Sequence, residues 1–262
     1  MINRERLLKF FMELVQIDSV SREERDLADR IIQEFDGIGI EVKEDKTGEL
    51  INGNAGNLII DIPGGNNMDP VLLSAHLDRV EPGRGIEPII NNGYILSKGK
   101  TVLAGDDLIG VAAIIEAIKV LKENNQVHRP IKVIFTVAEE IGLLGAKNLD
   151  PVELEGIVYG FVFDVDGDVG TIVNKAPSQI KFNAEIEGKS AHAGIEPGKG
   201  INAIKISSMA ISNMKLGQID DETTANIGVI KGGRASNIVP DMVELEGEIR
   251  SHSDHKLMLQ QK

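Results

Sequence analysis

The chain has 262 residues, and its 28 Lys and Arg against 41 Asp and Glu give a formal charge of −13 at pH 7. This acidic balance argues against a basic nucleic-acid-binding face. Because the sequence has no cysteine, disulfides, thiolate metal sites and cysteine nucleophiles are excluded, and any metal must be held by histidine and carboxylate side chains. With no apolar run of about 18 residues and no signal peptide, we expect a cytoplasmic protein with no membrane partner.

The first part of the chain alternates helices with apolar strands. Apolar residues recur at helical spacing over residues 7–14, and Ser21 with Glu24 forms a capping box that predicts the start of a second helix, ending at Gly37. A third, mostly apolar helix is expected over residues 110–125. Strands are expected at residues 40–45, 57–63, 71–76, 131–137 and 156–164, and the last four read as buried.

The pattern changes after about Pro177. Val243, Leu245 and Ile249 alternate with charged residues, which is typical of a sheet with one wet face. We expect an α/β catalytic domain over residues 1–177, with a mixed, mostly parallel sheet and helices on both faces, and a smaller α+β lid domain over 178–262. The lid reads as strands at 180–187, 224–230 and 242–250, with helices at 201–216 and from 254.

Two acidic clusters flank predicted strand ends or helix starts. His76 and Asp78 lie two apart at the end of a buried strand, so their side chains point to the same side, where the imidazole could ligate a metal while the carboxylate fixes its tautomer. The alternative is a surface pair without a role. Asp106 and Asp107 precede the long helix, where they could cap it, or one of them could bridge two metal ions.

Two further clusters directly follow strands. Glu139 and Glu140 are adjacent carboxylates that repel each other unless a cation lies nearby, so one could ligate a metal and the other take a proton from water. Asp164, Asp166 and Asp168 alternate after the next strand, but the glycine and glutamate positions do not match a calcium loop. Together the four clusters predict a carboxylate-rich dinuclear metal site.

These motifs closely resemble those of the M20 metallopeptidase family, and within it the peptidase T-like branch. The matching runs are AHLD at 75–78, GDDLIG at 105–110, AEEIGLLGA at 138–146, the FD ending at Asp164, and GKSAHAGIEPGKGINAI at 188–204. They occur in the order and approximate spacing of the family. The resemblance implies a catalytic α/β domain with two divalent metal ions, zinc or else cobalt or manganese, and a lid domain that forms a homodimer.

The resemblance also assigns roles to residues. His76, Asp106, Glu140 and Asp164 would be the metal ligands, with Asp106 bridging. Asp166 stays open as an alternative to Asp164, because a shift of one residue in the loop would exchange them. By the same resemblance Asp78 would orient His76 and Glu139 would be the general base.

Three residues of the lid domain match family positions that meet the substrate. His192 would cross to the partner subunit's active site and donate to the oxyanion, although it could instead be an ordinary loop residue. Arg250 would bind the substrate carboxylate, for which a guanidinium fork suits the geometry, or be a simple edge-strand charge. Asn237 is a further candidate for substrate binding.

The sequence departs from the family in two places. Leu108 replaces a common lysine, although both aspartates before it are kept. Family members also continue past the lid and return to the catalytic domain with a last metal-ligating histidine, so the sequence predicts a truncated chain. His252 and His255, at the exit of a lid strand, are not expected to replace that ligand.

The resemblance implies metal-assisted hydrolysis of short peptides, with removal of the N-terminal residue of tripeptides. An M20-type carboxypeptidase or N-acyl-amino-acid amidohydrolase would carry the same metal motifs and differ in the substrate terminus that it recognises. Two non-enzymatic alternatives are an inactive fragment that serves as a dimerisation module and a calcium-binding module built on residues 164–168.

Overall fold

The computed structural model describes residues 1–65 and 68–261, and the chain forms two compact units, Met1–Val169 and Gly170–Lys262. We call them the catalytic unit and the lid unit, after the two domains that the sequence predicts. Helices of the catalytic unit are α1 (Arg4–Leu14), α2 (Arg25–Asp36), α3 (Thr47–Ile51), α4 (Gly105–Glu123) and α5 (Leu144–Lys147), with a 3-10 helix, η1 (Pro151–Leu154). Its strands are β1 (Lys43–Glu44), β2 (Leu58–Ile62), β3 (Val71–His76), β4 (Pro88–Asn91), β5 (Tyr94–Ser97), β6 (Ile131–Thr136) and β7 (Tyr159–Val162).

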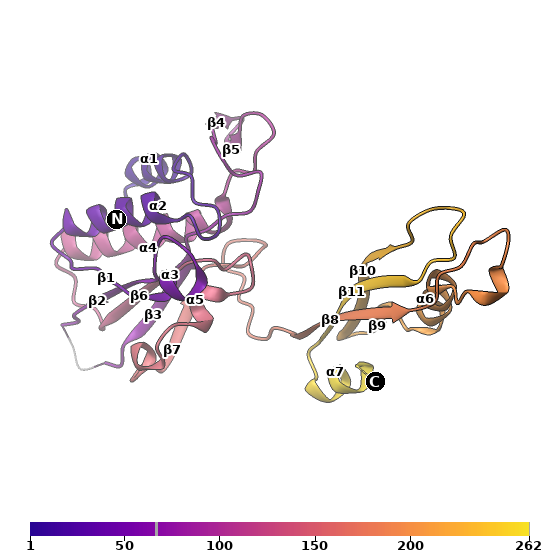
Figure 1. Ribbon diagram of the computed structural model, residues 1–262. Coiled ribbons are helices and arrows are strands. Elements are labelled where there is room, and N and C mark those ends of the chain that lie inside the picture. The colour runs from indigo at the N-terminus through magenta and orange to yellow at the C-terminus, as the bar shows by residue number, and fades with distance from the viewer. Residues whose placement is uncertain (66–67, 262) are drawn as a thin grey trace. The chain divides into compact units, whose positions relative to one another are not determined.

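Five strands of the catalytic unit form one mixed sheet in the order β1-β2-β6-β3-β7. β3 pairs in parallel with both β6 and β7, whereas β2 runs antiparallel to β1 and β6. Helices α1, α2 and α4 lie together on one side of this sheet (Figure 1). The parallel strands therefore end at the same edge, where an open α/β sheet places its functional residues.

The core of the catalytic unit lies between the sheet and these helices. In α2, Leu27, Ile31 and Phe35 recur four residues apart and are fully buried, so they form the apolar stripe of an amphipathic helix. Phe35 packs against Phe135 of β6, and burial of such a side chain contributes about 1.5–3 kcal/mol. On the other sheet face, Lys132 of β6 pairs with acidic groups of β2 and η1.

Strand β7 differs from its sequence prediction. Residues 156–164 were expected to form a buried strand, but all four residues of β7 are exposed. The physical reason is position: β7 is the edge strand, it pairs with β3 alone among the described strands, and its apolar side chains include Tyr159, Phe161 and Val162. An apolar run marks a strand but does not say whether that strand lies at the edge of its sheet.

The predicted start of the second helix, a capping box at Ser21 and Glu24, was also wrong. α2 begins at Arg25, its N-terminus has no side-chain cap, and the Ser21 hydroxyl instead donates to the carboxylate of Asp78. The hairpin β4-β5 was not predicted, although Asn92 and Gly93 between its strands both have positive φ and form the Asn-Gly pair that favours a tight hairpin turn.

The lid unit is an antiparallel sheet in the order β8-β11-β10-β9, with two helices on one face. Its strands are β8 (Ser178–Glu187), β9 (Gly217–Asp220), β10 (Thr223–Gly232) and β11 (Met242–Ser251), and its helices are α6 (Ala203–Asn213), α7 (Asp254–Gln260) and the short 3-10 helix η2 (Pro197–Lys199). β9 was not predicted, and the three other strands and both α-helices match the expected elements within a few residues.

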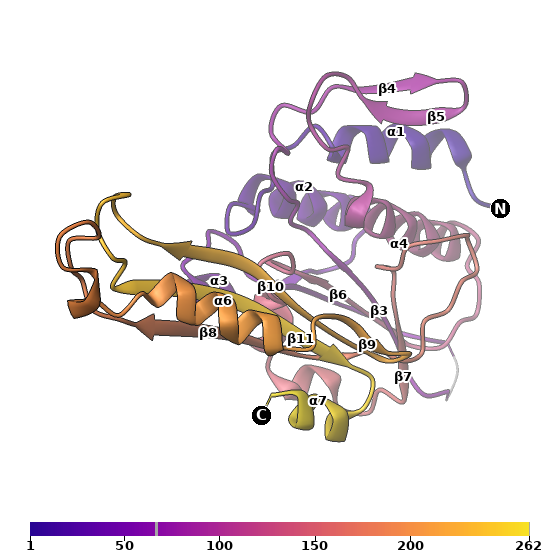
Figure 2. The ribbon, with the colours of Figure 1, turned by 90° about the vertical axis from the view of Figure 1, so that its right-hand side faces the viewer.

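The alternation predicted for β11 is confirmed. Val243 and Leu245 pack with Ala203 of α6, while Ile249 packs with Leu257 of α7, so the two helices cover different stretches of the same face (Figure 2). Gly247 lies between these clusters because a Cβ there would come within 2.4 Å of the Phe182 ring. The glutamates between these residues point to the other face.

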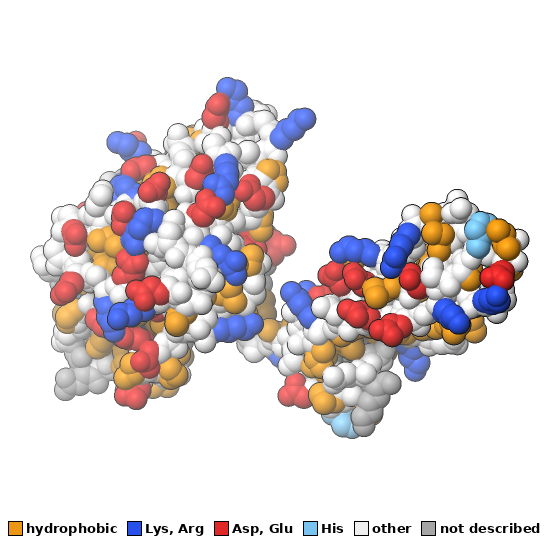
Figure 3. All heavy atoms as spheres, viewed as in Figure 1, with side chains coloured by type: hydrophobic (Ala, Val, Ile, Leu, Met, Phe, Trp, Pro, Cys, Tyr) orange, Lys and Arg blue, Asp and Glu red, His pale blue; other side chains and the backbone are white. Residues whose placement is uncertain are grey.

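Charges are mixed on the molecular surface. On the face in Figure 3, Lys and Arg side chains are interspersed with Asp and Glu side chains. Within the described part of the chain, no helix combines the length and the apolar character needed to cross a membrane.

Candidate metal centre

The candidate site forms at the end of β3, where His76 is 1% exposed. Its Nδ1 lies 2.9 Å from the carbonyl oxygen of Asp78 and 3.4 Å from Oδ1 of the same residue. Because a carbonyl oxygen can only accept, Nδ1 donates to it, and Nε2 is the nitrogen that faces the other carboxylates. The sequence prediction that Asp78 orients His76 therefore has a geometric basis.

Carboxylates from three other segments surround Nε2 of His76. Asp106 Oδ1 lies 2.9 Å away, and Glu139 Oε2 and Asp164 Oδ2 each lie 4.0 Å away. Two overlapping groups have ligand atoms within 4.8 Å of one another: His76, Asp106 and Glu140 in one, and His76, Glu139 and Asp164 in the other. The four clusters found in the sequence thus converge on one place.

Asp106 and Asp107 are held in a non-helical turn at the start of α4, not as first-turn acids of a regular helix. Asp107 is buried, and its Oδ2 accepts the backbone N–H of His76 at 3.1 Å. Gly110 makes room for this carboxylate, because a Cβ there would lie 2.3 Å from Asp107 Oδ1. Asp107 therefore supports His76 while Asp106 faces the cluster.

Asp78 holds the glutamate pair as well as the histidine. Its Oδ1 accepts the N–H of Glu139 at 2.8 Å, and its Oδ2 accepts the N–H of Glu140 at 3.2 Å and the hydroxyl of Ser21 at 2.6 Å. Sequence reasoning missed Ser21 and Asp107 as supports of the site. The Ser-x-x-Glu spacing was visible, but it indicated a helix cap and not a contact 57 residues away.

Burial and the neighbouring acidic groups shift the pKa values of His76, Glu139, Glu140 and Asp164. Burial alone lowers the pKa of His76, but Asp78, Asp106 and Asp107 outweigh it and raise that pKa to about 10. Burial, together with neighbouring carboxylates, raises the pKa of Glu139, Glu140 and Asp164.

The donor set fits a divalent cation. Among the described residues, none of the four carboxylates around His76 has a Lys or Arg ion-pair partner, so their mutual repulsion is relieved by His76 alone. One imidazole nitrogen and several carboxylate oxygens, without thiolates, are ligands that zinc, cobalt and manganese accept. A hollow of about 250 Å³ opens beside this cluster and is lined by Asp106, Asp107 and Asp164 among others.

Asp166 does not belong to this group of ligand atoms. Its Oδ1 accepts the N–H of Gly167 at 2.8 Å, whereas Oδ2 of Asp164 lies 4.0 Å from Nε2 of His76. This geometry favours Asp164 of the two residues that the sequence left open.

The predicted substrate residues lie in the lid unit. The His192 side chain is exposed, and its Nδ1 accepts the N–H groups of Gly194 and Ile195 at 3.2 Å. The carbonyl of Asn237 accepts the N–H of Ala193, the residue that follows His192, so His192 and Asn237 lie on neighbouring segments. Arg250 lies at the far end of β11 from Asn237, where it pairs with Glu248. His252 and His255 also lie in the lid unit.

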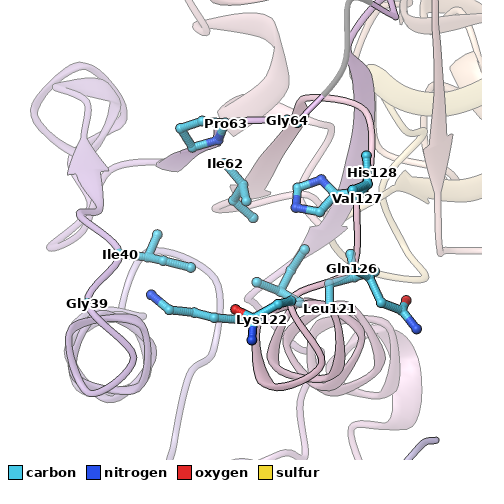
Figure 4. Close-up of a pocket in the computed structure, with 13 residues that line it drawn as sticks. Gly39, Ile40, Ile62, Pro63, Gly64, Leu121, Lys122, Gln126, Val127 and His128 are labelled. Atoms are coloured by element: carbon cyan, nitrogen blue, oxygen red, sulfur yellow. The ribbon is translucent and has the colours of Figure 1, made fainter.

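A separate hollow of about 490 Å³ is drawn in Figure 4. Its residues Val127 and His128 shortly precede β6, whereas Glu139 follows the other end of that strand. Apolar side chains of Ile62, Leu121 and Val127 line the hollow together with Lys122 and His128. The Nζ of Lys122 donates to the carbonyl of Ile38, and His128 contacts the carbonyl of Arg129. These groups are engaged by the backbone, so the carboxylate cluster is the stronger candidate for the functional site.

Two protein-family models match the chain. The model described as Peptidase family M28 matches residues 57–204, and the M20-type peptidase dimerisation domain matches residues 176–259. The chain is 48% identical to Bacillus subtilis YqjE over 99% of its own length and 70% of that protein. Among solved structures, aminopeptidase PepT from Bacillus cereus shares 48% identity with a TM-score of 0.91. A tripeptidase from Staphylococcus aureus shares 43% identity with a TM-score of 0.95.

The chain belongs to the M20 metallopeptidases, in their peptidase T-like branch. The M28 match covers mainly the catalytic unit, whereas the dimerisation domain and the likeness to PepT over 99% of the chain decide between the two families. The chain spans 69% of each of the two solved chains. The resemblance inferred from the motifs and the expected fold class are both confirmed, and the chain carries the catalytic unit of a peptidase.

Proposed function

We propose that this M20 peptidase is an aminopeptidase that removes the N-terminal residue of short peptides, tripeptides above all. The observation that carries the proposal is the convergence of His76, Asp106, Glu139, Glu140 and Asp164 at one edge of the sheet. Support comes from the PepT aminopeptidase and the tripeptidase, which share more than 40% identity with this chain.

His76, Asp106, Glu140 and Asp164 would hold a pair of divalent metal ions, with Asp106 shared between them. Zinc is the first expectation, and cobalt and manganese suit the same donors. When bound, such ions supply a Lewis acid that polarises a carbonyl and makes water a nucleophile near neutral pH.

Glu139 would be the general base. Its carboxylate is partly exposed and lies within the cluster, while its backbone is fixed by Asp78. It would accept a proton from the attacking water and return that proton to the leaving amine nitrogen.

The lid unit would complete the site in a homodimer. The dimerisation-domain match supports this assembly, and the exposed imidazole of His192 is free to reach a second protomer, where it would donate to the oxyanion. Asn237 and Arg250 would bind the substrate. The cytoplasmic location of the protein stays a prediction.

The test compares release of the N-terminal residue from tri-alanine and from N-acetyl-tri-alanine, with zinc, cobalt or manganese added. We expect metal-dependent cleavage of the free-amine peptide alone. Cleavage of the acetylated peptide would instead favour an amidohydrolase, and release of the C-terminal residue a carboxypeptidase.

Calorimetric metal titration tests the ligands separately from activity. Asp164→Asn should weaken metal binding, whereas Asp166→Asn, two residues away in the same loop, should not. The reverse result would exchange the roles of the two residues.

A further inference from the structure

Four consecutive backbone N–H groups directly after β6 each donate to a side chain from elsewhere in the catalytic unit. Val137 donates to Asn57 Oδ1 at 3.1 Å, and Ala138 donates to Glu24 Oε1 at 3.0 Å. The next two N–H groups, of Glu139 and Glu140, are those accepted by Asp78. The segment that carries the general base and a metal ligand is thus anchored along its whole length.

Glu24 is an unusual member of this set. It is fully buried, 114 residues from Ala138 in sequence, and its Oε1 also accepts the N–H of Arg22 at 2.9 Å. Its other oxygen, Oε2, is buried and has no hydrogen-bond partner among residues 1–65 and 68–261. Burying a carboxylate with so few partners is costly, and burial raises the pKa of Glu24 to about 7.

The ordinary roles of a buried glutamate do not account for this one. In the described part of the chain Glu24 has no Lys or Arg ion-pair partner, in contrast to Glu116, whose carboxylate pairs with Arg6. Its side chain does not cap α2 either. What remains are its backbone hydrogen bonds, a local one from the N–H of Arg22 and a long-range one from the N–H of Ala138.

Ala138 has a conformation that needs such a bond. Its φ of 51° is in the left-handed region, which is unfavourable for a residue other than glycine. Its carbonyl accepts the N–H of Leu144 at 3.0 Å, which closes the turn from the other side. The N–H and the carbonyl of Ala138 are therefore both hydrogen-bonded, and this residue directly precedes Glu139.

We propose that Glu24 is a positioning residue for peptide hydrolysis: by holding Ala138 in its left-handed conformation, it aims the side chains of Glu139 and Glu140 at the metal cluster. The inference rests on the proposed function, because it assigns the purpose of the turn to that reaction. Glu24 needs only a hydrogen-bond acceptor at the right distance for this role, and its charge is dispensable.

Two substitutions of Glu24 separate the effect of side-chain length from the effect of charge. Glu24→Gln keeps an accepting oxygen at the same distance but removes the charge, whereas Glu24→Asp keeps the charge and withdraws the oxygen by one methylene. We expect Glu24→Gln to stay within about threefold of wild type in metal affinity and kcat. We expect Glu24→Asp to lose about tenfold or more in both with little change in KM, as supports of metal ligands typically do.

The readouts are calorimetric metal titration, tri-alanine kinetics, and hydrogen exchange of the Ala138, Glu139 and Glu140 amides by NMR. Faster exchange of these amides is expected in Glu24→Asp and not in Glu24→Gln. The control is Glu116→Ala, a second buried carboxylate of the same unit, which should lower the melting temperature but leave metal affinity and local exchange unchanged.

The inference is overturned if Glu24→Asp matches wild type while Glu24→Gln is impaired, since charge would then be the requirement. It is also overturned if both variants keep wild-type exchange at the three amides. If wild type itself neither binds metal nor cleaves tri-alanine, the proposed function fails, and the exchange data still decide whether Glu24 anchors the turn.

Discussion

The catalytic and lid units bury different kinds of polar residues. Within the described part of the chain, every buried charged or histidine side chain lies in the catalytic unit, among them Glu24, His76, Asp78 and Asp107. The buried polar residues that are described in the lid unit are two serines and one threonine, Ser207, Ser251 and Thr223. A buried charge is stable only where a rigid, well-packed surrounding supplies its partners.

This difference follows from the size of each core. The catalytic unit has one continuous apolar core between its sheet and three helices, whereas the lid has two small clusters along one sheet face. The larger core can hold a preformed polar site. The residues that the lid offers, such as His192, are exposed and depend on a partner to gain a function.

The largest expected effect comes from the general base. Glu139→Gln should lower kcat on tri-alanine by a factor of about 10²–10⁴ with little change in melting temperature, because the side chain is partly exposed and its backbone anchor remains. Steady-state kinetics and a thermal melt measure the two quantities. Wild-type kcat in this variant would remove Glu139 from the mechanism.

Truncation of core side chains tests whether the two units unfold independently of each other. Phe135→Ala should destabilise the catalytic unit by about 3–5 kcal/mol, and Leu245→Ala should destabilise the lid unit by about 2–5 kcal/mol. Each variant should lower the unfolding transition of its own unit in calorimetry. A single transition that shifts equally in both variants would contradict independent units.

The buried carboxylate of Glu24 should make stability depend on pH. Its pKa rises from 4.5 to about 7 on folding, because burial, helped by the charge of Asp78, outweighs its hydrogen bonds. Between these values the folded state keeps a proton that the unfolded state has lost, so the free energy of unfolding falls as pH rises, by about 3 kcal/mol in total.

Glu24→Gln should remove this fall. Chemical denaturation of both proteins between pH 4.5 and 8, with a chelator present, measures the difference in unfolding free energy. The variant should gain on wild type as pH rises to about 7 and then keep a constant advantage. A difference that is the same at pH 5 and pH 8 would contradict the assignment.

The smallest effect is expected at the lid surface. Arg250 forms an exposed ion pair with Glu248, so Arg250→Ala should change stability by about 1 kcal/mol or less. If Arg250 binds the substrate carboxylate in the dimer, KM for tri-alanine should rise while that for tri-alanine amide stays constant. An unchanged KM for both peptides would leave Arg250 a surface charge.

Sequence reasoning recovered the features that depend on local pattern. The strand ends carrying His76, Glu139 and Asp164 were predicted from apolar runs, and the sheet brings these ends together. Prediction from the sequence failed where the hydrogen-bond partner of a side chain is far away in sequence. The Ser21 hydroxyl and the Glu24 carboxylate match a local capping box by spacing, but they also bind Asp78 and Ala138, which are far away in sequence and which no local rule can reveal.

The exposed edge strand β7 has a practical consequence for work with this chain in solution. Its outer backbone edge has no strand partner among residues 1–65 and 68–261, and its side chains Tyr159, Phe161 and Val162 are exposed and apolar, so the same strand of another molecule can add to it. Association of this kind grows with protein concentration, so light scattering should rise in concentrated samples. A charged substitution such as Val162→Lys should suppress that rise and extend the range in which the enzyme can be assayed or crystallised.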